Sequence, residues 1–317
     1  MIKIAVDAMG GDYAPKEQVE GAMIAIKKIP DIEITLYGDE VEIRKYLTNE
    51  ERITIVQSEG VIDMGEKDPI RAIRGNRKSS MALALSSVRN GENDAIVSSG
   101  ATQALIAGAH ILVGRMKSIK RTAIAPLIPT IHNTSTILLD AGGNIEIKPE
   151  YMVHQAYFAH IYAKEVLGIK EPKIGLLNIG TEPGKGRELD QEVFKLFTED
   201  TFLNFIGNVE GRDIMTDKVD VVVTDGFTGN VALKTLEGTM RGVVKALFAA
   251  ISAPEYKEHA DGLMPALLSL YSTFDPDTYG GAILLGVDGV CIISHGSSGS
   301  RAMLNGIKVA KEMVEVD

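Results

Sequence analysis

Short apolar runs alternate with longer amphipathic stretches along most of this chain. The runs are rich in Val, Ile and Leu, and some, such as Val221-Val222-Val223, contain no polar residue. Uninterrupted apolar runs of this length are typical of strands covered on both faces, as in a parallel sheet between helices. We therefore predict an α/β fold, a three-layer α/β/α structure with a mostly parallel sheet, whose strands lie at residues 2–6, 32–37, 53–56, 94–97, 123–127, 135–139, 173–178, 202–206, 220–224 and 290–294.

Helix start and stop signals lie between these runs. Asp68-Pro69 begins a short helix that Gly75-Asn76 ends, and Ser79-Ser80 caps a second helix that Asn90-Gly91 closes. A third helix is expected over residues 151–166. No linker rich in Pro, Gly or Ser and no repeat of fixed period divides the chain. We therefore expect a single domain over residues 1–317.

One segment departs from the alternation and predicts a protruding helical hairpin at about 240–277. Its uncharged stretch, 262–274, is apolar but too short to span a bilayer. The favoured interpretation is a dimer interface or a core helix, because a strongly basic face, the usual mark of interfacial helices, is absent. Reversible membrane contact is the alternative. The apolar side chains concerned are those of Leu263, Met264, Leu267, Leu268 and Leu270.

Composition places the chain among ordinary globular proteins. Apolar residues make up 45% of it, and the formal net charge is −10, which argues against general affinity for nucleic acid or anionic lipid. The single cysteine, Cys291, excludes an intrachain disulfide and favours a reducing compartment, the cytoplasm. The N-terminus lacks the features of a signal peptide. The longest uncharged stretch, 122–139, contains two prolines, His132 and Asn133, and is interpreted as two buried strands.

The loops that follow the predicted strands carry the candidate chemistry. In open parallel sheets, ligands bind beyond the carboxyl ends of the strands, where helix N-termini present unpaired N–H groups to anions. Small residues let an anion approach the backbone, and Ser, Thr and Asn supply neutral donors. Each loop alone could be a simple turn, but six at equivalent places predict a phosphate site. Its predicted binding residues are Asp7, Gly10, Gly11, Asp12, Ser98, Ser99, Gly100, Asp140, Asn178, Gly180, Thr181, Asp225, Gly226, Thr228, Gly229 and Lys234.

Known nucleotide, metal and thiol signatures do not fit. Gly180 to Gly186 lacks the spacing of a nucleotide phosphate loop, and no Gly-x-Gly-x-x-Gly follows the first strand, so no nicotinamide cofactor is indicated. The six histidines are scattered, which makes a metal site improbable. Cys291 lies in an apolar run, where packing is the expected role. His295, just beyond that run, is the better candidate for catalysis, with a structural hydrogen bond as the alternative.

A cluster of basic residues stands out on this acidic chain. It contains Arg71, Arg74, Arg77 and Lys78. Arg71 and Arg74 share one face of the predicted helix. A solvated face is the simpler interpretation, because most charge runs are solvated. Docking of an acidic partner is the alternative.

Taken together, the motifs resemble the bacterial phosphate acyltransferase family PlsX over nearly the whole chain. The resemblance is carried by Asp7-Ala8-Met9-Gly10-Gly11-Asp12, Leu177-Asn178-Ile179-Gly180-Thr181-Glu182, Gly207-Asn208-Val209-Glu210-Gly211, Asp225-Gly226-Phe227-Thr228-Gly229-Asn230-Val231-Ala232-Leu233-Lys234, Tyr279-Gly280-Gly281-Ala282 and His295-Gly296. One loop departs from the family pattern, because Ser98-Ser99-Gly100-Ala101-Thr102-Gln103 stands where the family commonly has Ser-Ala-Gly-Asn-Thr-Gly.

The resemblance implies an enzyme that converts acyl-[acyl carrier protein] and inorganic phosphate into acyl-phosphate for phospholipid synthesis. It also implies a fold like isopropylmalate dehydrogenase and phosphotransacetylase, a homodimer without a cofactor, and a peripheral place at the cytoplasmic membrane beside a downstream glycerol-3-phosphate acyltransferase. The acidic carrier protein would dock on the basic cluster.

The residues suggest direct attack by phosphate on the thioester. Lys185 and the backbone at Gly180 and Thr181 are expected to hold the phosphate. Asn230 and His295 are expected to stabilise the oxyanion or assist the thiolate. Asp140 and Asp225 would orient neighbours, because like charge repels phosphate. The rivals are a phosphotransacetylase that uses acetyl-CoA and a non-catalytic membrane scaffold.

Overall fold

The computed structural model describes residues 1–117, 119–275, 278 and 281–316. Within these residues the strands form a single eleven-stranded sheet in the order β3-β2-β1-β4-β11-β10-β5-β6-β9-β7-β8. The strands are β1 (Ile2–Asp7), β2 (Ile32–Gly38), β3 (Ile53–Gln57), β4 (Ala95–Ser98), β5 (Ala123–Pro129), β6 (Ser135–Leu139), β7 (Lys173–Leu177), β8 (Asn204–Val209), β9 (Val221–Val223), β10 (Ala282–Leu285) and β11 (Val290–Ile293).

The two halves of the sheet run in opposite directions. Strands β3, β2, β1, β4 and β11 are mutually parallel, and so are β6, β9, β7 and β8. Between them, β10 pairs antiparallel with β11 and β5, and β5 pairs antiparallel with β6. Because these three successive pairings are antiparallel, the strands of the second half run opposite to those of the first half. The carboxyl ends of β1, β4 and β11 therefore point away from those of β6, β7 and β9.

Helices cover both faces of the sheet, which confirms the predicted α/β class with a mostly parallel sheet. They are α1 (Lys16–Lys28), α2 (Glu40–Arg44), α3 (Pro69–Gly75), α4 (Ser80–Arg89), α5 (Thr102–Gly108), α6 (Pro149–Glu165), α7 (Glu188–Glu199), α8 (Gly226–Ile251), α9 (Lys257–Phe274) and α10 (Ser300–Val316). In the first half, one core joins α1 and α10 to the sheet and another lies under α4 and α5. In the second half, α6 and α7 cover one face and α8 covers the other.

The predicted strand runs all contain strands; the run 135–139 coincides with β6, and the others differ from the observed strands at one or both ends. The largest shift is in the run 202–206, because β8 begins only at Asn204. Phe202 lies outside the strand and packs its ring against Tyr157 and His160. One strand was missed: β10, whose sequence Ala-Ile-Leu-Leu has little of the β-branched character that marks the others. The stretch 122–139 forms β5 and β6, as expected.

Helices α3 and α4 begin where the sequence signals place them. The Asp68 side chain accepts a hydrogen bond from the Arg71 amide, and Asn76 lies at the C-terminal end of α3. The Ser79 hydroxyl accepts from the Ala82 amide at the start of α4. Side-chain oxygens at these positions satisfy amides that have no partner within the helix. Both helix predictions are confirmed.

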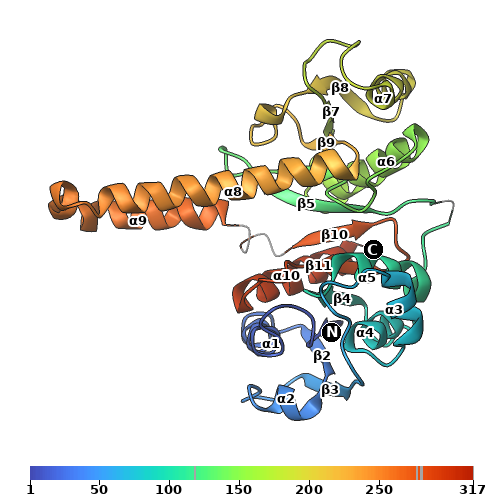
Figure 1. Ribbon diagram of the computed structural model, residues 1–317, viewed down its shortest axis with the longest axis vertical. Helices are drawn as coiled ribbons and strands as arrows, with labels where there is room; N and C mark the ends of the chain where they lie inside the picture. Colours follow the sequence, from blue (N-terminus) through green and yellow to red (C-terminus); the bar gives the residue numbers. More distant parts are fainter. Residues whose placement is uncertain (118, 276–277, 279–280, 317) are drawn as a thin grey trace.

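Helices α8 and α9 form a long hairpin that projects from the body of the molecule (Figure 1). Leu263, Leu268 and Leu270 are exposed on α9, whereas Met264 and Leu267 are half-buried. In the described part of the chain, no helix combines the length and apolar character needed to cross a bilayer.

Candidate active site

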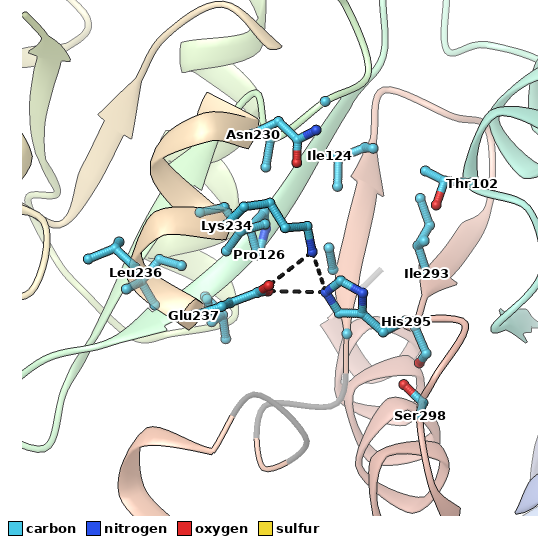
Figure 2. Close-up of a pocket in the computed structure, with 18 of the residues that line it drawn as sticks. Thr102, Ile124, Pro126, Asn230, Lys234, Leu236, Glu237, Ile293, His295 and Ser298 are labelled. Carbon is cyan, nitrogen blue, oxygen red and sulfur yellow. Dashed lines mark hydrogen bonds and ion pairs between the residues drawn. The ribbon is translucent and has the colours of Figure 1, made fainter. Parts of the chain in front are cut away.

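A cavity of about 430 Å³ lies on the face of the sheet formed by β5, β10 and β11. Helix α8 forms one wall, and the loop after β11, which carries His295, forms the wall opposite (Figure 2). Thr102 and Gln103, at the start of α5, close the polar end together with Gly142. The other end is apolar and is lined by Leu236, Met240, Phe274, Ile128, Pro129 and Met215. The cavity therefore joins a polar end to an apolar end.

The wall formed by α8 presents Asn230, Lys234 and Glu237 to the cavity (Figure 2). Their spacing of four and three residues places them on one face of the helix. The Lys234 ammonium donates to Glu237 Oε2 at 2.9 Å, and His295 Nε2 lies 3.1 Å from Glu237 Oε1. Nε2 also lies 3.0 Å from Lys234 Nζ. These three groups form one polar cluster across the cavity.

The cluster fixes the charge of Glu237. Burial raises the pKa of this carboxyl, but the hydrogen bonds from His295 and Lys234 outweigh burial and hold the pKa at about 2. Glu237 is therefore ionised at neutral pH. His295 Nε2 donates to this carboxylate only when Nε2 carries a proton, and it accepts from Lys234 only when it does not. The proton on Nε2 thus decides which neighbour the imidazole binds.

The first turn of α8 is held by Asp225. Its carboxylate accepts from the amides of Phe227 and Thr228 and from the Thr228 hydroxyl. Arg187 donates to the same carboxylate at 2.5 Å. Burial raises the pKa of Asp225, yet these donors keep it below its ordinary value. The charged cap fixes the start of the helix that carries Asn230.

Two glycines allow the close packing that places Asn230. A Cβ at Gly229 would lie 2.0 Å from the carbonyl oxygen of Asp140, so only glycine lets α8 approach the loop after β6. Gly142, at φ +124°, lies beside the Asn230 side chain, and its carbonyl accepts from Gln103 Nε2. Asp140 shapes this loop by accepting from the amides of Ile124, Gly143 and Asn144, although burial raises its pKa.

The loop after β1 supports the opposite wall. The Asp12 amide donates to the Gly296 carbonyl at 2.8 Å, next to His295. Asp7 is fully buried, which raises its pKa, and it accepts from the Ser98 hydroxyl at 2.7 Å. A Cβ at Gly10 would lie 2.5 Å from Asp7 Oδ2 and 2.7 Å from the Gly100 amide nitrogen. This packing fixes the loop that carries His295.

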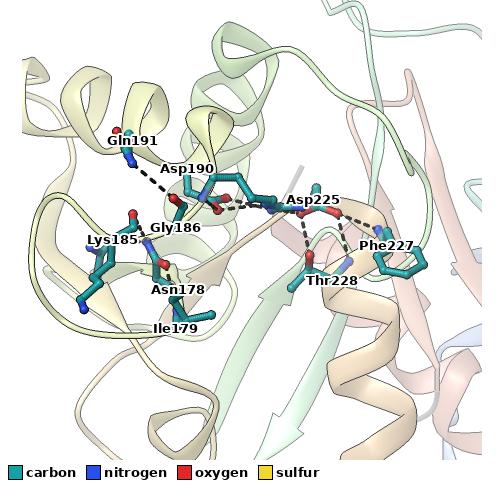
Figure 3. A network of polar contacts seen from close by, with 11 residues as sticks. Asn178, Ile179, Lys185, Gly186, Asp190, Gln191, Asp225, Phe227 and Thr228 are labelled. Carbon is teal, nitrogen blue, oxygen red and sulfur yellow. Dashed lines mark hydrogen bonds and ion pairs between the residues drawn. The ribbon is translucent and has the colours of Figure 1, made fainter.

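The loop after β7 lies apart from the cavity. Within it, Asn178 Nδ2 donates to the Lys185 carbonyl (Figure 3). The Lys185 ammonium lies 3.8 Å from the Glu182 carboxylate. The ion pair of Arg187 with Asp225 ties the segment after this loop to the start of α8.

The predicted residues therefore fall into three groups. Asn230, Lys234 and His295 line the cavity. The residues of a second group do not line the cavity but support the loops and the helix that do. They are Asp7, Gly10, Gly11, Asp12, Ser98, Ser99, Gly100, Asp140, Asp225, Gly226, Thr228 and Gly229. Lys185, Asn178, Gly180 and Thr181 are not among the residues that line the cavity. The expectation that all six loops share one rim is wrong. Segments after β4, β6, β9 and β11 contribute lining residues, whereas the loop after β7, a strand that lies two places beyond β6 in the sheet, contributes none of the residues that line the cavity.

Sequence reasoning missed Glu237 and Gln103. Glu237 follows Lys234 by three residues and Asn230 by seven, so helical periodicity from the Asp225 cap onward could have placed it on the same face. Of the motif Tyr279-Gly280-Gly281-Ala282, Tyr279 and Gly280 lie outside the described residues, whereas Gly281 and Ala282 line the cavity.

The fold places the chain in a structural class that includes phosphotransacylases. A phosphotransacetylase from Streptococcus pyogenes aligns with 99% of this chain and 94% of its own, with a TM-score of 0.66 at 18% identity. A candidate 4-hydroxythreonine-4-phosphate dehydrogenase from Salmonella typhimurium covers 98% and 99%, with a TM-score of 0.52 at 12% identity. These similarities concern the fold alone, and they confirm the predicted resemblance to the folds of phosphotransacetylases and dehydrogenases.

Sequence comparison then identifies the family. The model of the fatty acid synthesis protein family matches residues 2–317. The phosphate acyltransferase of Geobacillus sp. (strain WCH70) is 46% identical over 317 residues, which cover all of this chain and 96% of that protein. The chain belongs to the PlsX phosphate acyltransferase family and is an acyltransferase, as the sequence motifs indicated.

Proposed function

We propose that this acyltransferase moves an acyl group from acyl carrier protein to inorganic phosphate, which yields acyl-phosphate and free carrier protein for phospholipid synthesis. The observation that carries the proposal is the cavity itself. Its polar section holds Asn230, Lys234 and His295, and its apolar section continues along the same helix. A phosphate and a thioester with a hydrocarbon tail need this combination.

Phosphate would bind between Lys234 and His295. The Lys234 ammonium supplies the positive charge, and a protonated His295 adds a second charge and a donor. Glu237 holds both side chains in place and offsets one of the two charges. This arrangement gives Lys234 the role that sequence reasoning gave to Lys185.

The reaction is then a direct displacement at the thioester carbonyl. A phosphate oxygen forms the new bond to carbon, and the Asn230 amide donates to the oxyanion of the tetrahedral intermediate. Collapse of that intermediate breaks the C–S bond and releases the carrier protein as a thiolate. An alkyl thiol has a pKa near 8.5, so departure needs little help from an acid, and His295 or water returns the proton.

The acyl chain would lie along α8 and β5. Leu233, Leu236 and Met240 follow one side of the helix, opposite Pro126 and Ile128 of the strand. Burial of each methylene contributes about 0.8 kcal/mol, so a long chain gains affinity that an acetyl group lacks. This apolar wall favours a long-chain donor over acetyl-CoA.

The carrier protein would dock on α3. Arg71, Arg74, Arg77 and Lys78 are all exposed. Met64, a few residues before α3, lines the cavity, and a Cβ at Gly296 would lie 2.5 Å from its Cε. The basic cluster is therefore joined by a short loop to the wall that carries His295. An acidic carrier protein seated there could deliver its thioester to the cavity.

The hairpin would serve the assembly and location of the enzyme. Its exposed leucines suit a homodimer interface and a peripheral contact of this cytoplasmic enzyme with the membrane, where a glycerol-3-phosphate acyltransferase consumes the product. Liposome flotation of Leu267→Glu against the parent protein tests the membrane role. Weaker flotation of the variant supports it, and equal flotation rejects it.

One assay tests the activity. Purified protein is incubated with palmitoyl carrier protein and phosphate, and acyl-phosphate is trapped with hydroxylamine. Palmitoyl hydroxamate that requires both phosphate and enzyme is the expected product. Turnover of acetyl-CoA in preference to the palmitoyl donor would identify a phosphotransacetylase instead. Binding of the carrier protein without any thioester cleavage would leave only a scaffold role.

A further inference from the structure

Two side chains close the apolar end of the cavity. Met240 of α8 and Phe274, the last residue of α9, line it there. The same two residues also line a second cavity, of about 20 Å³, that lies between α8 and α9. The remaining residues around this small cavity are Arg241, Val244, Tyr271 and Asp275. Met240 and Phe274 thus separate the main cavity from the small cavity between α8 and α9.

We propose that Met240 and Phe274 set the longest acyl chain that the enzyme accepts without strain, and that the space behind them becomes part of the acyl site when either side chain is shortened. The inference rests on the proposed function. It adds the residues that determine chain length, which neither the family motifs nor the polar cluster identifies.

The length of the cavity wall supports this role. Asn230 and Met240 are ten residues apart on α8, so the wall between them is about 15 Å long. Fully extended backbone advances at most about 3.6 Å over three bonds, and an alkyl chain of similar geometry therefore advances about 1.2 Å per bond. About twelve carbons of an extended chain span this wall. A palmitoyl chain is longer and would reach Met240 and Phe274.

The chemistry of the two side chains also fits a barrier that limits how far an acyl chain enters the cavity. Methionine is flexible and fills irregular gaps, and a phenylalanine ring presents a broad apolar surface. The space behind them has room for about one water molecule, and Val244 beside it is buried. Truncation of either side chain would join the small space to the main cavity and lengthen the apolar channel into the base of the hairpin.

The experiment measures a chain-length profile. Carrier protein is charged with octanoyl, lauroyl, myristoyl, palmitoyl, stearoyl or arachidoyl groups, and phosphate-dependent release of the carrier thiol is followed for the parent enzyme, Met240→Ala and Phe274→Ala. In each variant, the rate with stearoyl relative to palmitoyl should rise about tenfold, the value of two newly buried methylenes. Leu270→Ala is the matched control, because this exposed leucine lies one turn earlier on α9 and lines neither cavity. Its profile should match the parent profile.

A second substitution acts in the opposite direction. Met240→Trp enlarges the side chain at this position and should shift the preferred donor towards lauroyl. A thermal unfolding midpoint close to that of the parent protein shows that the variant is folded. Profiles that stay unchanged in Met240→Ala, Phe274→Ala and Met240→Trp, with the parent enzyme active, would overturn the inference. Absence of phosphate-dependent thiol release by the parent enzyme with every donor would instead overturn the proposed function.

Discussion

The Glu237 carboxylate and the His295 imidazole lie 3.1 Å apart, although 58 residues separate them in the chain. Glu237 comes from α8, which packs on the second half of the sheet, and His295 follows β11 of the first half. Their contact therefore joins the two halves of the molecule at the cavity. Because Lys234 binds the same carboxylate, Glu237 sets the positions of both groups that would receive the phosphate.

Glu237→Gln should lower the rate more than it lowers binding. The amide keeps the shape of the side chain but loses the charge that orients Lys234 and His295. We expect kcat to fall about tenfold to a hundredfold, with little change in the apparent KM for the acyl donor. A kcat like that of the parent enzyme would show that Glu237 has only a packing role.

The same residue should make stability depend on pH in acid. The folded pKa of Glu237 is about 2, below the ordinary value of 4.5, so its stabilising effect is complete above pH 4.5 and is lost as pH falls through 2. The shift corresponds to at most about 3 kcal/mol, and to less because Lys234 and His295 are about half exposed. Urea unfolding at graded pH should show a shallower loss of stability below pH 4.5 for Glu237→Gln. An identical acid dependence would contradict this linkage.

Lys234 and Lys185 form a matched pair of lysines for a test of phosphate binding. Lys234 lines the cavity, whereas Lys185 is half exposed outside it and forms an ion pair with Glu182. Lys234→Ala should raise the apparent KM for phosphate at least about tenfold, which corresponds to the loss of one charge-assisted hydrogen bond. Lys185→Ala should change it much less. Steady-state kinetics with phosphate as the varied substrate measures both, and a larger effect at Lys185 would return the phosphate site to the loop after β7.

Charge reversal in the basic cluster at and after α3 should affect the acyl donor and not the phosphate. Arg74→Glu combined with Arg77→Glu would repel an acidic carrier protein, because both side chains are exposed. We expect the apparent KM for palmitoyl carrier protein to rise at least about fivefold, by an amount that shrinks as salt is added. The KM for phosphate should stay constant. The matched control is the double variant Lys27→Glu and Lys28→Glu, which reverses two adjacent lysines in the last turn of α1. Equal effects of the two double variants would mean that only net charge matters.

The sequence predicted the local structure well because the signals were local. Asp68 and Ser79 cap helices through hydrogen bonds to amides three residues away, so their sequence neighbours suffice to place α3 and α4. Cys291 is buried as its apolar run indicated, and burial raises its pKa to about 12. Asn230 and His295 were selected from motifs that fix backbone turns, and both line the cavity.

The remaining features depend on long-range pairing. The relative direction of the two halves of the sheet follows from how many antiparallel pairings separate them. With β10 unrecognised, that number could not be determined. The distance of the loop after β7 from the cavity depends on the strand order, because β7 lies two strands beyond β6 on the side away from β5. Glu237 has a similar explanation, because its distinctive property is its contact with His295 and not any pattern in its own segment.

In the proposed reaction, phosphate meets the thioester beside Asn230. The decisive measurement is the rate of carrier thiol release from palmitoyl carrier protein as phosphate is varied, for the parent enzyme and Asn230→Ala. We expect a saturable requirement for phosphate in the parent enzyme and a kcat about a hundredfold to a thousandfold lower in the variant, the usual loss for one oxyanion donor. Thiol release that does not depend on phosphate, or a variant with the full parent rate, would contradict this mechanism.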